Sequence, residues 1–201
     1  MNRTVSGPAW AAVARRLGVD ESALRAVADV ESSGDGFLPA PSDQPKVLFE
    51  GHVFHRLTGG RFDAVAPNLS FPHWDRSKYA RSAVGEWRRL EAAMALDRQA
   101  ALKAASWGAF QIMGENHALC GFPSVEEFVQ AQKAGADEQL AAFATFISRA
   151  PFIGALRSRN WARFAAAYNG PGYASNRYDS KLATAYAGHT ERLVADAAHQ
   201  V

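Results

Sequence analysis

The chain has 201 residues, of which 48% are hydrophobic and 21% are charged. A chain of this length buries roughly 70% of its unfolded surface, so one compact domain spanning residues 1–201 is expected. The 22 basic and 20 acidic residues leave a net charge of +2, which excludes a strongly basic nucleic-acid binder and an acidic disordered tail. No apolar run approaches the ~20 residues that span a bilayer, so we expect no stable membrane insertion.

The N-terminal segment lacks the continuous apolar block of a secretory signal, because Gly7 and Pro8 interrupt it. We therefore expect a protein that is made in the cytoplasm without a signal peptide. Cys120 is the single cysteine, which excludes an intramolecular disulfide framework. Its expected place is the hydrophobic core, where a thiol acts as a small apolar group.

Hydrophobic spacing and capping residues predict a mostly helical fold, and about a fifth of the chain is alanine, the strongest helix former. The expected helices cover residues 8–17, 21–31, 51–57, 77–97, 98–105, 124–134, 137–149, 160–168 and 178–198. Asp20 is the expected N-cap of the second helix, with its carboxylate accepting from the first turn. Residues 46–50 are the best candidate for a strand, so the fold class is mostly α with a minor β element.

Glu31 is the most informative single residue. It follows Leu24 and Ala28 at helical spacing, which places a carboxylate on an apolar helix face. Burial and the negative end of the helix dipole both raise the pKa of a carboxyl group at this position. A carboxylic acid that stays protonated near neutral pH suits general-acid catalysis, whereas a solvated helix-end glutamate is the ordinary alternative.

Three motifs occur in a specific order: Glu31-Ser32, then Gly108-Ala109-Phe110-Gln111-Ile112-Met113, then Ala167-Tyr168-Asn169-Gly170. This series resembles the motifs of the lysozyme-like superfamily, as seen in lytic transglycosylases. Together with Val47-Leu48-Phe49-Glu50-Gly51-His52, it resembles the single-domain N-acetylmuramidases that phages of Gram-negative bacteria use as endolysins. The resemblance covers nearly the whole chain from about residue 8 and implies a lysozyme-like single domain.

The resemblance implies that Glu31 is the catalytic acid acting on the β-1,4 bond between N-acetylmuramic acid and N-acetylglucosamine. It also places Gln111, Tyr168 and Asn169 along the saccharide cleft, where an amide contacts N-acetyl groups and a tyrosine ring faces a sugar. Trp107 is a further candidate for sugar contact, with plain core packing as the alternative.

The second carboxylate of a glycosidase is harder to assign from sequence. Glu50, at the end of the candidate strand, is the leading candidate for a base that aligns water. The alternatives for Glu50 are capping the following helix near Gly51 or anchoring a core hydrogen bond. Asp35 and Asp43 lie on loops near the first motif and are weaker candidates.

The resemblance implies further that the partner is the peptidoglycan glycan strand, that no metal or other cofactor is needed, and that the protein is a monomer released to the periplasm by a holin-type partner. His52 and His55 share a helical face, but the zinc-protease motifs are absent, so we expect no zinc site. Two alternative functions remain open on sequence alone. One is a lytic transglycosylase that forms 1,6-anhydro-muramic acid products, and the other is a non-catalytic cell-wall-binding protein on the same fold.

Overall fold

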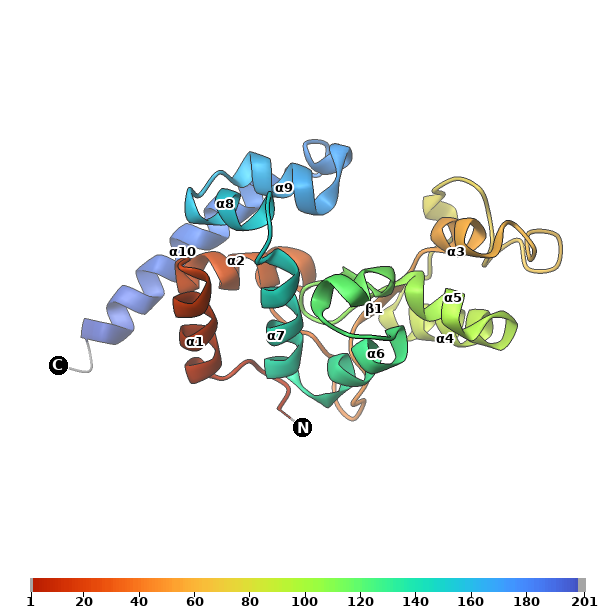
Figure 1. The fold of residues 1–201 in the computed structure, drawn as a ribbon, viewed down its shortest axis with the longest axis horizontal. Helices are drawn as coiled ribbons and strands as arrows, with labels where there is room; N and C mark the ends of the chain where they lie inside the picture. Colours follow the sequence, from red (N-terminus) through yellow and green to blue (C-terminus); the bar gives the residue numbers. More distant parts are fainter. Residues whose placement is uncertain (1, 199–201) are drawn as a thin grey trace.

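A computed structural model describes residues 2–198, which fold into helices around one small sheet (Figure 1). The α-helices are α1 (Gly7–Leu17), α2 (Glu21–Ser32), α3 (Gly51–Thr58), α4 (Ala83–Leu96), α5 (Arg98–Lys103), α6 (Val125–Ala134), α7 (Ala136–Ile147), α8 (Phe152–Arg157), α9 (Trp161–Asn169) and α10 (Tyr178–Ala198). Short 3₁₀ helices are η1 (Arg76–Lys78), η2 (Gly114–Cys120) and η3 (Pro171–Tyr173). The predicted mostly helical fold class is confirmed, while α8 and the 3₁₀ helices were not predicted.

Side-chain caps set several of the predicted helix ends. Ser124 accepts from the Glu127 amide at 3.2 Å and Asn160 accepts from the Arg163 amide at 3.0 Å, as the sequence pattern predicts for α6 and α9. The expectation for Asp20 is wrong in part. Asp20 occupies the N-cap of α2, but its carboxylate makes no capping bond and instead accepts from the Tyr186 hydroxyl at 2.8 Å, since α10 packs beside it.

The helix predicted over residues 77–97 begins later, at Ala83. Ser82 caps it by accepting from the Gly85 amide at 3.1 Å, and Asp75 holds Ser77 in the separate turn η1. Val84, in the first turn of this helix, is 55% exposed, whereas Trp87 and Leu90 are buried. Residues 79–82 therefore form a non-helical segment between η1 and α4.

The sheet has three short antiparallel strands in the order β1 (Val47–Phe49), β2 (Ala105–Trp107) and β3 (Ile112–Met113). The strand predicted over 46–50 is confirmed, but β2 and β3 were missed because strands of two or three residues carry no readable alternation. Between β2 and β3 the chain turns at Gly108, whose φ of +72° favours glycine. A Cβ on Gly108 would lie 2.7 Å from the Gln132 and Gln139 side chains.

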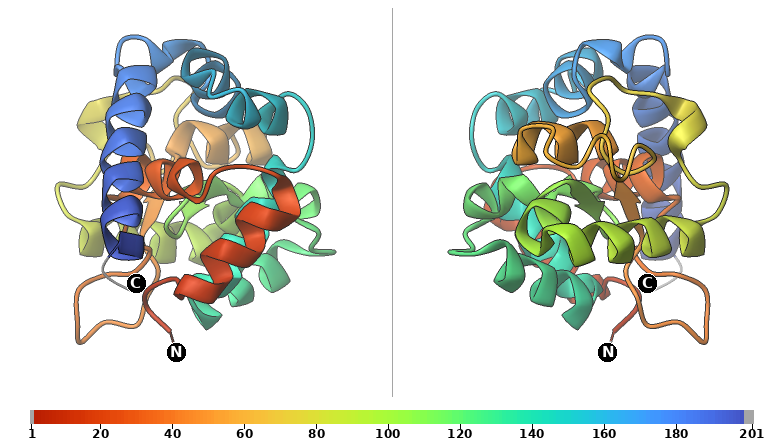
Figure 2. Two further views of the ribbon diagram at one scale, coloured as in Figure 1. Left: turned by 90° about the vertical axis from the view of Figure 1, so that its left-hand side faces the viewer. Right: turned by 90° about the vertical axis from the view of Figure 1, so that its right-hand side faces the viewer.

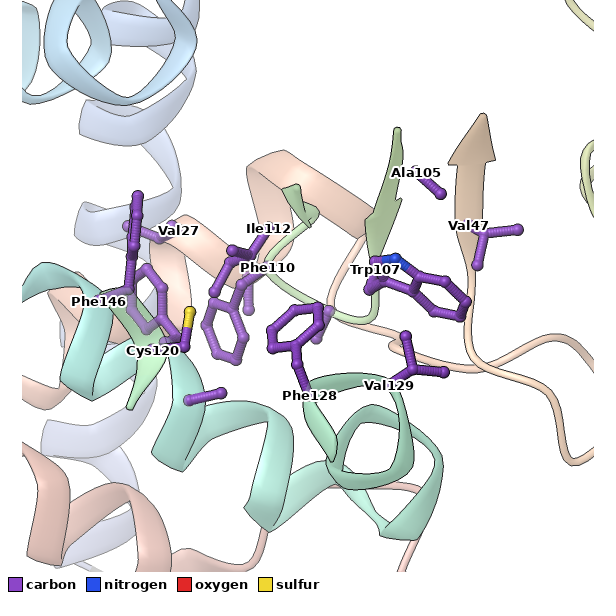
Figure 3. Close-up of a cluster of buried hydrophobic side chains, with 14 of the residues drawn as sticks. Val27, Val47, Ala105, Trp107, Phe110, Ile112, Cys120, Phe128, Val129 and Phe146 are labelled. Carbon is purple, nitrogen blue, oxygen red and sulfur yellow. The ribbon is translucent and has the colours of Figure 1, made fainter. Parts of the chain in front are cut away.

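One buried hydrophobic cluster includes residues from most of the helices and from the sheet. Figure 3 shows its part around Trp107, Phe110 and Phe128. Phe110 stacks on Phe143 with ring centroids 4.1 Å apart, and Cys120 is buried nearby. The predicted core position of Cys120 is confirmed, and burial raises the pKa of its thiol to about 12. This core fixes the relative positions of the sheet turn and the helices around it.

The helix α10 runs along one flank of the molecule and packs against α2 and α9 (Figure 2). Two polar contacts join α10 to α2: the Tyr186–Asp20 bond and a 2.7 Å contact between His189 Nε2 and Asp29. On the opposite side lie α3, α4 and α5 (Figure 1). The end of α2 thus lies between the C-terminal helices and the sheet.

The amide of Gln139 ties the sheet turn to α6. It is fully buried, accepts from the Ala109 amide at 2.8 Å and donates to the Gln132 carbonyl at 2.8 Å. Gly36 lies so close that a Cβ there would be 2.1 Å from the Gln139 oxygen. One side chain therefore positions three segments that are far apart in sequence.

We expect Gln139→Leu to lower the free energy of unfolding by about 2–4 kcal/mol, because two buried backbone groups lose their partners. Urea unfolding measures this loss. The matched control is Gln99→Leu, at an exposed position on α5, which should change stability by less than about 0.5 kcal/mol. Equal effects of the two variants would show that the hydrogen bonds of Gln139 do not stabilise the fold.

Candidate active site

Glu31 lies in the last turn of α2, two residues before Ser33 ends the helix in the left-handed region with φ 61°. Leu24 and Ala28 on the same face are buried, as the spacing predicts. The Lys46 ammonium donates to the Ser32 carbonyl at 2.7 Å and so satisfies one of the free carbonyl groups at this helix end. This bond ties the end of α2 to the residue that precedes β1.

Burial dominates the electrostatics of Glu31. It raises the pKa of the carboxyl group from 4.5 to about 7, while a hydrogen bond from Asn169 and the charge of Lys181 act in the opposite direction. The predicted direction of the shift is therefore confirmed. Lys181 comes from α10, which the sequence analysis did not connect with the site.

Asn169 is the group that orients Glu31. Its Nδ2 donates to Oε1 of Glu31 at 2.8 Å across 138 residues of sequence. Because Oε1 accepts this bond, the proton of the neutral acid resides on Oε2. The other amide atom, Oδ1 of Asn169, is buried without a hydrogen-bond partner among the described residues.

A groove of about 350 Å³ opens beside the carboxyl group. Its walls come from the end of α2, the strand β1, the segment before α4, α4 itself and the sheet turn. The lining residues are Glu31, Ser32, Lys46, Val47, Leu48, Ala80, Arg81, Ser82, Ala83, Glu86 and Gln111. Segments of the first two motifs thus meet at one groove, and Asn169 joins the third motif to it through Glu31.

Gln111 faces this groove from the turn between β2 and β3, with a φ of +46°. Its Nε2 donates to the Gly108 carbonyl at 2.9 Å, and its Oε1 accepts from the Ser106 hydroxyl at 2.8 Å. These bonds hold the amide in place while one N–H and one lone pair remain for another partner.

The two aromatic candidates for sugar contact, Trp107 and Tyr168, both pack against the core, which was the stated alternative for Trp107. Trp107 is only 1% exposed; its ring packs edge-on against Trp87 and its N–H donates to the Leu102 carbonyl at 3.1 Å, so it is a core residue. The hydroxyl of Tyr168 turns inward and donates to the Phe110 carbonyl at 2.6 Å, rather than opening onto the groove. Its ring packs among four phenylalanines, because α9 faces α7 and α8 there. Tyr168 is therefore a partly buried residue that packs against the core.

Glu50 does not line the groove of Glu31. It occupies the N-cap position of α3, as one of the alternatives expected, but its carboxylate makes no capping bond. Its carboxylate accepts a hydrogen bond from the Tyr79 hydroxyl and lies 3.4 Å from His52 Nδ1. Burial raises the pKa of Glu50, with the Tyr79 bond opposing the shift. This geometry matches the alternative in which Glu50 anchors a buried hydrogen bond.

Glu86 is a groove residue that the sequence analysis missed. It is 4% exposed and accepts from the amides of Phe49 and Ala80, and its Oε2 pairs with Arg89 at 2.7 Å. It precedes Leu90 and Ala93 at helical spacing, so the criterion that selected Glu31 also finds Glu86. Its bonds hold the 79–82 segment against the strand β1.

The two histidines considered for zinc have other contacts. His55 bonds Asp63 at 2.8 Å, and His52 lies beside Glu50. Within residues 2–198 no group of three or more His, Cys, Asp or Glu side chains has a metal-binding arrangement. In the same part of the chain no helix combines the length and the apolar character needed to cross a bilayer.

The sequence profile of the N-acetylmuramidase family matches residues 20–190. The chain belongs to the N-acetylmuramidase family. This N-acetylmuramidase also resembles the crystal structure of the Burkholderia AP3 phage endolysin, with a TM-score of 0.83 and 40% sequence identity over 95% of this chain and 72% of that chain. No curated protein matches it. The predicted family and lysozyme-like fold are confirmed, and the chain is a lysozyme-type glycoside hydrolase of peptidoglycan.

Glu31 should make the stability of the N-acetylmuramidase depend on pH. Its raised pKa in the folded state contributes stability below pH 4.5, and this contribution is lost as the pH rises through about 7. Glu31→Gln imitates the protonated acid and keeps the acceptor for Asn169. We expect the variant to be more stable than the wild type at pH 8 by up to about 3 kcal/mol, and equally stable at pH 4.

Urea unfolding at both pH values tests this expectation. Glu91→Gln, on the exposed side of α4, is the matched control and should show no pH-dependent difference. If the stability difference between Glu31→Gln and the wild type is the same at pH 4 and at pH 8, Glu31 is not buried as a neutral acid.

Glu50 and Tyr79 should behave as a coupled structural pair. We expect Glu50→Gln and Tyr79→Phe each to cost about 1–3 kcal/mol of stability, and the double variant to cost less than their sum by about 1 kcal/mol. Hydrolysis should fall less than tenfold in each single variant. The control is Tyr186→Phe, which removes a tyrosine–carboxylate bond far from the groove. If Glu50→Gln instead lowers the rate of hydrolysis by about 10²-fold or more at unchanged stability, Glu50 acts as a base.

Proposed function

We propose that this N-acetylmuramidase acts as a phage endolysin that cleaves the β-1,4 bond between N-acetylmuramic acid and N-acetylglucosamine, with Glu31 as the general acid. The observation that carries the proposal is a buried carboxyl group with a pKa of about 7 that opens onto a groove. An acid of this pKa is largely protonated at the pH of the cell wall and still acidic enough to release its proton.

The chemistry follows from the orientation of the carboxyl group. The proton on Oε2 passes to the glycosidic oxygen as the bond from that oxygen to the anomeric carbon breaks. The electron pair leaves with the oxygen, and positive charge develops on the ring of the muramic acid. Glu31 is then ionised next to this charge and stabilises it. Water adds to the anomeric carbon and keeps one proton as the new hydroxyl group. The proton that it releases returns to the Glu31 carboxylate, directly or through solvent, and restores the acid.

Two amides are proposed to position the substrate. The unpartnered Oδ1 of Asn169 is a buried acceptor that an N-acetyl N–H or a hydroxyl of the sugar satisfies. The remaining N–H and lone pair of Gln111 face the groove. Tyr168 supports the site from behind, through its bond to Phe110.

Among the described residues, only Glu31 and Glu86 bring carboxylates to the groove. Arg89 compensates the charge of Glu86, and two backbone amides occupy its oxygens. Glu86 therefore shapes the wall of the groove, and Glu31 is the carboxyl group free to react.

The remaining features of the proposal concern the setting in the cell. The enzyme is a monomer that needs no cofactor, is made in the host cytoplasm, and reaches the cell wall from the periplasm after a holin-type partner opens the inner membrane. The protein from Burkholderia AP3 phage, described as an endolysin, supports this setting by similarity.

Glu31→Gln should reduce the release of soluble fragments from purified sacculi by about 10²–10⁴-fold, because the amide has no proton to donate. Circular dichroism should show an unchanged fold. Analysis of the reducing ends from wild-type digests should give muramic acid with a free reducing end, as hydrolysis requires. Near-wild-type turnover by a folded Glu31→Gln variant would refute the assignment of Glu31 as the general acid. Products with 1,6-anhydro ends would refute hydrolysis as the reaction.

A further inference from the structure

A second, larger hollow of about 990 Å³ adjoins the groove of Glu31. The residues that line it are Leu48, Trp74, Arg76, Ser77, Tyr79, Ala80 and Arg81. Leu48, Ala80 and Arg81 also line the groove, so the two spaces lie next to each other. The volume lies at the upper end of the roughly 300–1,000 Å³ typical of ligand pockets.

The hollow is cationic. Arg76 and Arg81 are both exposed, and neither side chain has a hydrogen bond or ion pair within residues 2–198. The neighbouring carboxylates are already engaged: Asp75 accepts from Ser77, and Glu50 accepts from Tyr79. Two guanidinium groups are therefore available to an anionic ligand, with which each is able to form paired hydrogen bonds.

An aromatic surface accompanies the two arginines. Trp74 is 61% exposed, which is unusual for so large an apolar side chain, and its ring lies 6.1 Å from that of Tyr79. Exposed tryptophan beside arginine is typical of binding surfaces rather than of plain solvent-facing loops.

Contacts with Glu50, Glu86 and Arg89 hold the segment that carries these groups in place. The Tyr79 hydroxyl donates to Glu50, and the Ala80 amide donates to Glu86. Arg89 packs over the Tyr79 ring at 5.2 Å and pairs with Glu86. The hollow is thus pre-organised by buried contacts and requires little ordering when a ligand binds.

We propose that this hollow binds the acidic peptide arm carried by the N-acetylmuramic acid units of peptidoglycan, with Arg76 and Arg81 pairing with its free carboxylates. The inference rests on the proposed function, because the groove of Glu31 must hold the sugar from which the arm extends. The hollow and the groove share Leu48, Ala80 and Arg81, so a branched ligand seated in the groove can extend into the hollow. Charge complementarity favours a peptide with several carboxylates, because two arginines line the hollow. The enzyme then prefers peptide-bearing strands to strands from which an amidase has removed the peptides.

The test compares kcat/KM on soluble peptide-bearing glycan oligomers and on the same oligomers after amidase treatment. Arg76 lines only the outer hollow, so Arg76→Gln isolates its contribution. We expect this variant to lose about 5–20-fold on peptide-bearing oligomers and less than twofold on peptide-free ones. Arg16→Gln, an exposed arginine on the distant helix α1, is the matched control and should change neither rate.

Calorimetric binding to the inactive variant Glu31→Gln adds a readout that is independent of turnover. A disaccharide with its peptide should bind at least fivefold more tightly than the peptide-free disaccharide, and adding Arg76→Gln should remove this difference. Equal losses on both substrates, or none, would overturn the peptide subsite and point to a sugar-binding or inert surface. If the wild type cleaves neither oligomer, the proposed function itself is overturned.

Discussion

The hydrogen bond from Asn169 to Glu31 is the contact on which the arrangement of the site depends. It joins the end of α2 to the end of α9, and both helices owe their positions to the core around Phe110 and Phe143. Without the anchored Asn169 amide, the Glu31 carboxyl group would be free to rotate and to exchange the positions of its two oxygen atoms. With it, one oxygen is fixed as an acceptor and the other is directed to the groove.

Burial of Glu31 also explains why the surrounding structure contains so many fixed polar side chains. Raising the pKa of a carboxyl group requires low-dielectric surroundings, but each backbone group near such a site still needs a partner. Lys46, Gln139 and Glu86 supply these partners for the helix end, the sheet turn and the 79–82 segment, respectively. Side-chain hydrogen bonds, rather than long strands, thus hold these segments in place.

The sequence predicted the helices and Glu31 well because both depend on local spacing. The periodicity of Leu24, Ala28 and Glu31 is visible along one helix, and the cap residues Ser124 and Asn160 act within three positions. The direction of Trp107 and Tyr168 was not predictable in this way. A side chain in a motif faces the core or the groove according to packing between distant segments. Here Trp107 is buried, and Tyr168 is partly buried against the core with its hydroxyl bonded to Phe110. Glu86 was overlooked although its spacing carried the same signal as that of Glu31.

The buried position of Cys120 has a practical consequence for experiments on this enzyme. Maleimides and related reagents attack the thiolate, and a thiol with a pKa of about 12 that is 4% exposed offers almost none. Since it is the single cysteine of the chain, a cysteine introduced at the surface would be the only reactive one. A fluorophore or spin label on the rim of the outer hollow would then report on ligand binding without removal of the native thiol or repacking of the core around it.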